Sequence, residues 1–281
     1  MSLSKSALLV ELNISSWSGR KLDRKVSEET NKAKGANKDA IRANKNLFCG
    51  SDKLEKINNF VSAARQEYYT MTLPWSTSGA RLLPFKEFFN FQQWVSTKEA
   101  EFDIMVDTFL TEYSSLISIQ AFRLGSMFDA SEYPLSSELK CKFKFGHIII
   151  PMPEAGDFRI DAEADLKAAL EEQYKAAYEE RTIVAMNDLW DRLYTTVSHL
   201  RDKCAMEKTI FRESTMDNAL ELCSLLTRLN VTGDANLEAR RQELEKALCS
   251  TSTDALRADE GVRNDVKDKM DALLAKMKGV L

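Results

Sequence analysis

The chain has 281 residues, and its 43 acidic side chains outnumber its 39 Lys and Arg side chains, so the formal net charge is −4. Only two histidines are present, and the ten glycines do not cluster. These counts argue against a histidine-rich metal or acid–base site and against a glycine-rich loop for phosphate. No stretch approaches about 18 consecutive apolar residues, so we expect no segment that crosses a membrane.

The cysteines are odd in number and widely spaced, and none forms a CxxC pair. The N-terminal apolar stretch is too short for a signal-peptide core, so the sequence predicts a cytosolic protein. In that compartment we expect reduced and mostly buried thiols. The five cysteines are Cys49, Cys141, Cys204, Cys223 and Cys249.

The five prolines all lie within residues 74–153, so both flanks are free to form long helices. Apolar residues alternate with polar ones from Leu8 to Ser15, which predicts a half-buried strand. The polar stretch 20–48 favours one or two weak, solvated helices. Apolar residues then recur at intervals of three and four from Leu54 to Tyr68, which predicts an amphipathic helix.

The middle of the chain is predicted to mix loops, strands and one long helix. Residues 71–84 favour an ordered loop, because Pro, Gly and Ser interrupt the stretch. Helical spacing over 85–124 predicts one long helix, or one that breaks once. Alternation returns at 143–149, and 158–160 favours a short third strand. Because an isolated strand is not stable, we expect the strands near residues 10 and 147 to pair in a small sheet.

A second long helix is predicted from residue 162 to about 206, since these 45 residues contain neither Pro nor Gly. At 1.5 Å per residue it would reach about 67 Å, more than the roughly 50 Å diameter of a compact chain of this length. The helix must bend or break, or the molecule is elongated. Apolar residues stepping by three and four mark a coiled-coil seam. The residues that we predict to bind a partner or a second copy are Ile183, Met186, Trp190, Leu193, Val197 and Leu200, and the seam continues to Cys204.

Three shorter amphipathic helices follow, and residues 249–263 are the predicted linker before the last of them. The fold class is therefore mainly α with a small antiparallel β-sheet (α+β), and its long helices form an elongated bundle or a coiled-coil-like arm. We predict a mixed part at 1–161, a long-helix bundle at 162–249 and a C-terminal helix at 264–281.

The net charge conceals two unlike segments. Residues 20–56 hold eleven basic and six acidic side chains, which gives a net charge of +5. Residues 154–192 hold five basic and eleven acidic side chains, which gives a net charge of −6. The basic segment predicts phosphate binding through counterion release, with two tryptophans as platforms for single-stranded bases. Two alternatives stay open: a solvated helix of mixed charge, or pairing with the acidic helix of a second copy. The candidate nucleic-acid-binding residues are Trp17, Arg20, Lys21, Arg24, Lys25, Lys32, Lys34, Lys38, Arg42, Lys45 and Trp75.

Catalytic signatures are missing from the sequence, which contains no HExxH, GxGxxG, GxxxxGK[ST] or GxSxG motif. His147 and His199 are interpreted as structural, and Cys204 as part of the seam. We expect no cofactor, no metal and no enzymatic activity. The helix dipole is sufficient to explain the carboxylates before the long helix, because acidic side chains interact favourably with a helix N-terminus. These acids are Glu154, Asp157, Asp161, Glu163 and Asp165.

Five segments, at residues 8–23, 72–75, 81–84, 156–161 and 188–194, carry a family resemblance. They resemble an uncharacterised family of proteins from tailed bacteriophages and prophages, and the similarity covers most of residues 5–235. The resemblance implies a phage origin and the cytoplasm of an infected bacterium. It also implies a gene setting beside a MoxR-type AAA ATPase and a von Willebrand A-type protein, or among DNA-metabolism genes. It transfers no catalytic residue.

Two functions follow as expectations. The first is a non-enzymatic assembly protein that oligomerises or docks a phage or host protein through its helical seams. The alternative is a nucleic-acid-binding accessory factor of phage DNA metabolism, which uses the basic segment on single- or double-stranded DNA.

Overall fold

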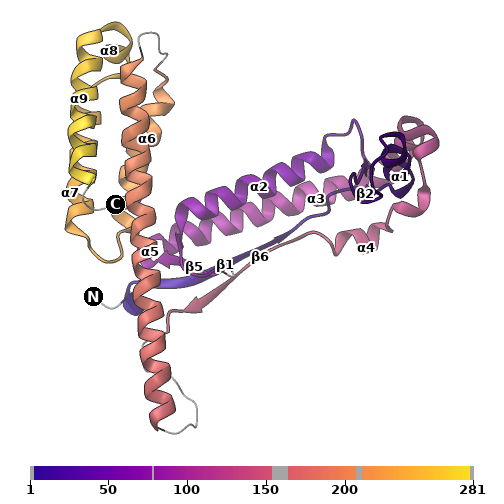
Figure 1. Ribbon diagram of the computed structural model, residues 1–281, viewed down its shortest axis with the longest axis horizontal. Coiled ribbons are helices and arrows are strands. Elements are labelled where there is room, and N and C mark those ends of the chain that lie inside the picture. Colours follow the sequence, from indigo (N-terminus) through magenta and orange to yellow (C-terminus); the bar gives the residue numbers. More distant parts are fainter. Residues whose placement is uncertain (1–2, 78, 154–163, 207–210, 279–281) are drawn as a thin grey trace. The chain divides into compact units, whose positions relative to one another are not determined.

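The computed structural model describes residues 3–77, 79–153, 164–206 and 211–278 (Figure 1). It is 69% helical with one small four-stranded antiparallel sheet, which confirms the prediction of a mainly α fold with a small β-sheet. The described helices are α1 (Arg24–Ala33), α2 (Lys53–Met71), α3 (Phe88–Leu124), α4 (Ser136–Lys140), α5 (Ala164–Ala205), α6 (Glu213–Leu229), α7 (Ala235–Cys249), α8 (Thr253–Ala258) and α9 (Glu260–Met277). The strands are β1 (Ala7–Ser15), β2 (Arg20–Leu22), β3 (Asn44–Asn46), β4 (Leu73–Pro74), β5 (Arg81–Pro84) and β6 (Lys144–Pro151). Short 3-10 turns lie at Leu3–Lys5, Phe85–Glu87, Gly125–Met127 and Ala130–Glu132.

The chain divides into two compact units. Unit 1 comprises Met1–Glu11, Tyr69–Phe91 and Ile149–Leu281, and unit 2 comprises Leu12–Tyr68 and Gln92–Ile148. This division differs from the predicted parts at 1–161, 162–249 and 264–281. The reason is that β1, α2, α3 and β6 each run from one unit into the other, so the N-terminal strand joins the unit of the C-terminal helices.

The four-stranded sheet has the order β4-β5-β1-β6, so the predicted pairing of the strand near residue 10 with the strand near 147 is confirmed. Ala7 lies opposite Pro84, and Leu73 lies opposite Leu82. The segment 71–84, predicted as a loop, supplies β4 and β5 because its leucines are fully buried when the strands pair. The strand predicted at 158–160 lies outside the described residues.

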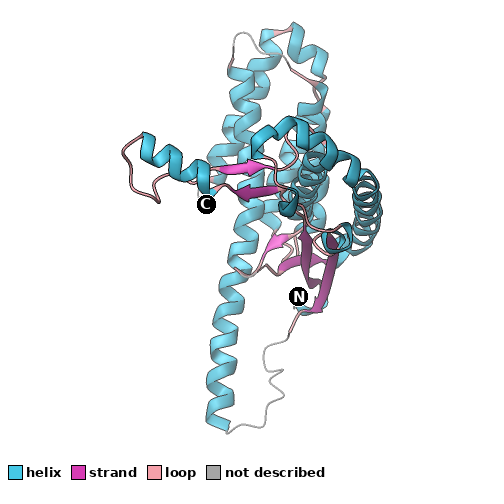
Figure 2. Cartoon of the chain, turned by 90° about the vertical axis from the view of Figure 1, so that its right-hand side faces the viewer, coloured by secondary structure: helices cyan, strands magenta, loops and turns pink. Residues whose placement is uncertain are grey.

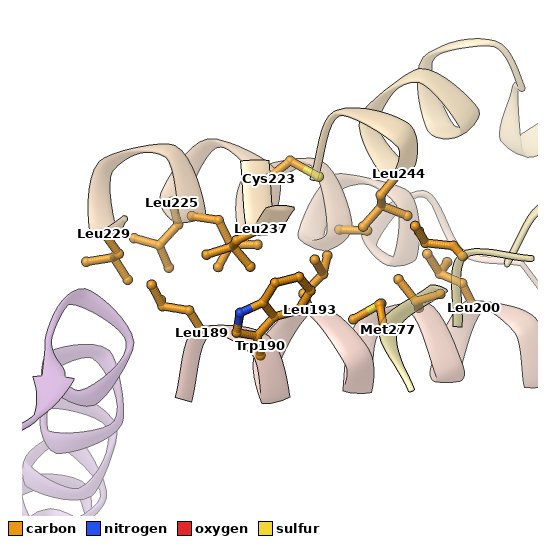
Figure 3. Packing of buried hydrophobic residues seen from close by; sticks show 14 of the residues in the cluster. Leu189, Trp190, Leu193, Leu200, Cys223, Leu225, Leu229, Leu237, Leu244 and Met277 are labelled. Atoms are coloured by element: carbon orange, nitrogen blue, oxygen red, sulfur yellow. The ribbon is translucent and has the colours of Figure 1, made fainter. Parts of the chain in front are cut away.

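The core of unit 1 forms where the second half of α5 packs against α6, α7 and α9 (Figure 3). Leu189 and Leu193 of α5 are fully buried there, together with Leu229 of α6 and Met277 of α9. α5 is continuous over 42 residues, and at 1.5 Å per residue it is about 63 Å long. The predicted long helix is therefore present without a break between Ala164 and Ala205.

The predicted linker 249–263 is wrong, because it contains α8 and the first turn of α9. Leu256 of α8 is 1% exposed and belongs to the core of unit 1. Ser252 caps α8 and Asp259 caps α9 through side-chain acceptors, so polar residues that suggested a linker are helix caps.

The core of unit 2 lies between α2 and α3 and is rich in aromatic side chains. Phe48 contacts Phe109 and Tyr133 with ring centroids 5.6 and 5.7 Å apart. Tyr133 also donates a hydrogen bond to the carbonyl oxygen of Leu47 at 2.8 Å. These contacts fix the chain just after β3, and so they anchor the basic segment that precedes them.

Candidate nucleic-acid interface

The basic segment folds into a small module that we call the basic appendage, residues 20–46. Strands β2 and β3 pair antiparallel, with Arg20 opposite Asn46 and Lys21 opposite Lys45. α1 and a loop at 34–43 connect the two strands, and Figure 2 shows the strand pair beside this helix. The sequence predicted one or two solvated helices here, and the structure has one helix framed by a strand pair.

Two buried polar residues on the inner face of α1 hold the loop in place. Ser27 accepts a hydrogen bond from the backbone N–H of Ala43 at 2.9 Å. Asn31 donates to the carbonyl oxygens of Lys38 and Ile41 at 2.8 and 3.0 Å. Sequence reasoning missed both residues, although their spacing of four on an otherwise charged helix is the signal that would have identified an inward polar face.

The appendage presents basic side chains to solvent. Among the described residues, Arg42 is the only one of the exposed basic side chains of the appendage that has an ion-pair partner, the exposed Asp39 at 4.0 Å. Glu28 and Glu29 share the exposed face of α1, so the excess of positive charge lies mainly on β2 and on the loop. The exposed basic residues are Arg20, Lys21, Arg24, Lys25, Lys32, Lys34, Lys38 and Arg42.

The positive charge also acts on a neighbouring carboxylate of unit 2. The pKa of Asp129 lies below its ordinary value, first because Ser131 donates hydrogen bonds to it and then because Lys45 and Lys21 attract its charged form. Asp23 is occupied in another way, since it caps α1 by accepting from the backbone N–H of Val26. Neither acid cancels the exposed bases on the loop.

Three predicted binding residues are not available as expected. The side chain of Lys45 is 6% exposed, forms an ion pair with Glu132 at 2.5 Å and donates to the carbonyl oxygen of Met127 at 2.7 Å. Trp75 is buried in unit 1 against Tyr178. Trp17 is half-buried and packs edge-on against Phe48. Trp75 is therefore a core residue and not a platform for bases, whereas Trp17 is only partly exposed.

The coiled-coil seam is also covered by its own chain, so the prediction that it docks a partner or a second copy is wrong for most of its length. Trp190 and Leu193 are labelled in Figure 3, where α6 and α7 cover them. Met186 is half-buried against the same core, and Ile183 alone is 60% exposed. The fully covered seam residues are Trp190, Leu193, Val197, Leu200 and Cys204.

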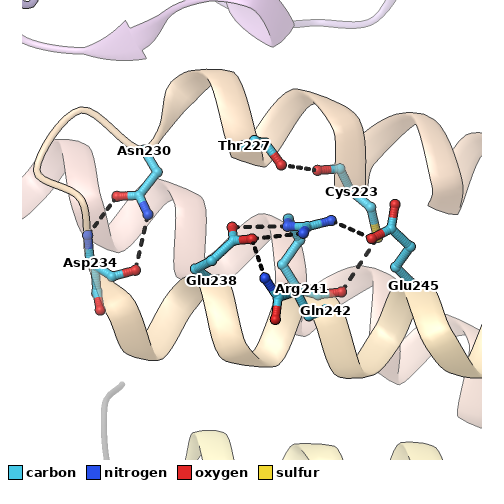
Figure 4. Close-up of polar contacts among 8 residues, drawn as sticks. All are labelled: Cys223, Thr227, Asn230, Asp234, Glu238, Arg241, Gln242 and Glu245. Carbon is cyan, nitrogen blue, oxygen red and sulfur yellow. Dashed lines mark hydrogen bonds and ion pairs between the residues drawn. The ribbon is translucent and has the colours of Figure 1, made fainter.

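A polar network runs along α7, one of the helices that cover the seam (Figure 4). Arg241 lies between Glu238 and Glu245, to which its guanidinium donates at distances of 2.7 to 2.9 Å. The hydrogen bonds that Arg241 donates to Glu238, and then the one that it donates to Glu245, raise the pKa of Arg241 above its ordinary value. Asp234 caps α7 and also accepts a hydrogen bond from the Trp190 indole at 3.1 Å.

The thiols and histidines show no nucleophilic arrangement within the described residues. Burial raises the pKa of Cys204 and of Cys223 to about 11, which disfavours the reactive thiolate. All five cysteines are free, but only these two are buried, so the expectation of mostly buried thiols is wrong. His147 lies within hydrogen-bond distance of Gln92, and His199 is exposed on α5.

In the described ranges no group of three or more His, Cys, Asp or Glu side chains is placed to hold a metal ion. The acids predicted at the entry to the long helix lie outside those ranges, apart from the exposed Asp165. No described helix combines the length and the apolar character needed to cross a membrane. Comparison with protein families, curated proteins and solved structures finds no match to this chain.

Proposed function

We propose that this protein is a non-enzymatic nucleic-acid-binding factor that contacts the phosphate backbone through the basic appendage. The observation that carries the proposal is the exposure of eight basic side chains on one small module, seven of them without an ion-pair partner among the described residues. Unpaired Lys and Arg side chains gain affinity for a polyanion because binding releases condensed counterions. Contacts with the phosphate backbone position a protein on the nucleic acid without distinguishing one base sequence from another.

The exposed side chains favour sequence-independent binding. Stacking needs exposed aromatic rings, but Trp75 is buried and Trp17 is half-buried with its ring against Phe48. We therefore expect single- and double-stranded DNA to bind with comparable affinity, with a dissociation constant on the order of 10⁻⁶ to 10⁻⁴ M at physiological salt. The affinity for duplex should fall more steeply with salt, because duplex has the higher charge density.

Replacing Arg20, Lys21, Arg24 and Lys25 by Glu should abolish binding. The expected loss exceeds about 100-fold at low salt, and the slope of log affinity against log salt should fall by about 3 to 4. An electrophoretic shift assay across a salt series measures both quantities. All four side chains are exposed, so the fold should be unchanged.

A matched control reverses four exposed basic residues outside the appendage: Lys86, Lys175, Arg181 and Lys246. This control changes the net charge by the same amount and should lower affinity only slightly. Equal losses in the two variants would mean that net charge alone, and not the appendage, attracts DNA. Absence of any shift at low salt with the wild-type protein would rule the function out.

The second candidate is assembly with another copy, which one observation favours. The first half of α5 exposes Leu166, Ile183 and Val184, and residues 164–191 hold seven acidic side chains against three basic ones. The appendage residues 20–42 hold eight basic and four acidic side chains, so the two surfaces are complementary between copies. Light scattering without DNA should then show a dimer at low salt and a monomer after the same four charge reversals. A monomer at every salt concentration would contradict this candidate.

The setting that we propose, the cytoplasm of an infected bacterium and a place among phage DNA-metabolism proteins, is supported by the family resemblance of the sequence alone. A pull-down from infected cells with and without nuclease separates a protein partner from a DNA-mediated one. Loss of every partner on nuclease treatment supports DNA binding, and partners that survive it support assembly.

A further inference from the structure

Unit 1 contains a polar pocket that neither the appendage nor the seam explains. It has a volume of about 400 Å³ and lies between the last turns of α5 and the first turns of α6. Two apolar side chains, a leucine and an alanine, complete a lining that is otherwise polar or basic. The residues that matter for its chemistry are His199, Lys203, Arg212, Ser214, Thr215 and Asn218.

The charged side chains that line the pocket have one sign. Its described lining contains two cations and one histidine but no carboxylate. Lys203 and Arg212 have no ion-pair partner among the described residues, whereas the adjacent Arg201 is paired with Asp202 and Asp271. Within the described residues, Lys203 and Arg212 therefore contribute positive charge to the pocket lining that no ion pair offsets.

The pocket is also rich in hydrogen-bond donors that come from two helices and from the residue that precedes α6. Lys203 of α5 donates to the Thr215 hydroxyl of α6 at 2.9 Å, which holds the ammonium group at the pocket. Arg212 contributes a planar guanidinium with several N–H groups, and Asn218 contributes an amide. Hydroxyl groups of Ser214 and of two threonines on α5 add further donors.

We propose that this pocket binds the phosphate group of a small phosphomonoester. A phosphate dianion offers more acceptor oxygens than a carboxylate, so it can accept hydrogen bonds from more of the donors that line the pocket. A guanidinium and an ammonium group together suit two negative charges, since Arg binds oxyanions in a bidentate manner and Lys binds them as a point charge. The site lies in unit 1 and is independent of the appendage, which lies wholly in unit 2.

Titration of the ¹⁵N-labelled full chain with inorganic phosphate, and then with phenyl phosphate, tests the proposal. At constant ionic strength, both ligands should shift the amide signals of residues 213–218 with a saturable, millimolar affinity. Tighter binding of phenyl phosphate than of inorganic phosphate would show that the pocket prefers a phosphomonoester to free phosphate. Matched titration with chloride should leave these signals unchanged.

Arg212→Gln should weaken phosphate binding about tenfold. The substitution removes a charge-assisted hydrogen bond, and the loss of one such bond lowers affinity by about that factor. Arg212 is exposed and makes no ion pair within the described ranges, so this variant should fold normally. Lys175→Gln, at an exposed position elsewhere on α5, is the matched control and should bind as the wild type does. Unchanged affinity in Arg212→Gln, or shifts confined to the appendage, would overturn the proposal and leave DNA binding by the appendage untouched.

Discussion

Leu193→Ala should destabilise unit 1 by about 3 kcal/mol, because a fully buried leucine loses its transfer free energy and leaves a cavity behind. For a unit of this size, that loss corresponds to a fall of about 10 °C in Tm. Leu193 lies where α5, α6, α7 and α9 meet, so few side chains can move to fill the space. Chemical denaturation followed by circular dichroism measures the change in unfolding free energy.

Ile183→Ala is the matched control, because Ile183 belongs to the same repeating pattern on the same helix. Its side chain is 60% exposed, so truncation should change stability by less than about 0.5 kcal/mol. If the seam were instead an interface between chains, Leu193→Ala would dissociate an oligomer and Tm would depend on protein concentration. A Tm that falls equally in both variants would contradict the packing in Figure 3.

The seam illustrates what a repeating pattern determines. The spacing from Ile183 to Cys204 identified the apolar face of α5 and the unbroken helix that carries it. It did not identify what covers that face, because a partner chain and the chain's own later helices satisfy the same apolar stripe. Leu237 of α7 and Met277 of α9, far along the sequence, supply the cover.

In the basic appendage, too, the sequence predicts a general property but not which single side chains are exposed. Composition predicted correctly that this segment is basic, but the sequence does not distinguish the exposed Lys21 from its strand partner Lys45. Lys45 is removed from the surface by Glu132, a residue that no local pattern connects with it. Trp75 is likewise buried by Tyr178, about a hundred residues away along the chain. Exposure at these positions depends on contacts that arise only after folding.

One structural cluster was not predicted at all, and it fixes the end of α2 within unit 1. Arg192 of α5 donates hydrogen bonds to the carbonyl oxygens of Tyr69, Thr70 and Thr72 at 2.9, 2.6 and 2.9 Å. The last carbonyls of a helix have no partner within the helix and carry its negative dipole, so a guanidinium satisfies both needs. Asp188, one turn earlier on α5, lies 2.8 Å from the same guanidinium.

Arg192→Met should therefore destabilise the protein by about 2 kcal/mol, since it removes a donor from three carbonyl oxygens and the ion-pair partner of the half-buried Asp188. Arg81, which also donates to the carbonyl oxygens of Tyr69 and Thr72, limits the loss. Arg192→Lys should recover only part of that loss, because an ammonium group lacks the planar fork that spans several acceptors. Asp188→Asn should change stability by less than about 1 kcal/mol, because the carbonyl oxygens still hold the guanidinium. Denaturant titrations of the three variants measure these differences. A loss in Asp188→Asn as large as that in Arg192→Met would show that the ion pair, and not the carbonyl contacts, fixes the helix end.

The pH dependence of stability distinguishes the effect of burial on Asp188 from the effect of its ion pair with Arg192. Burial raises the pKa of Asp188 above its ordinary value of 3.8, and this effect outweighs the opposing attraction of Arg192 and Arg81. Because the folded-state pKa exceeds the unfolded value, folding favours the neutral acid. The corresponding stability is fully present below the unfolded pKa and is lost as the pH rises through the folded pKa. Asparagine does not titrate, so the stability of Asp188→Asn relative to the wild type should be greater at pH 7 than at pH 4. The opposite trend would mean that the ion pair with Arg192 dominates over burial at this carboxylate.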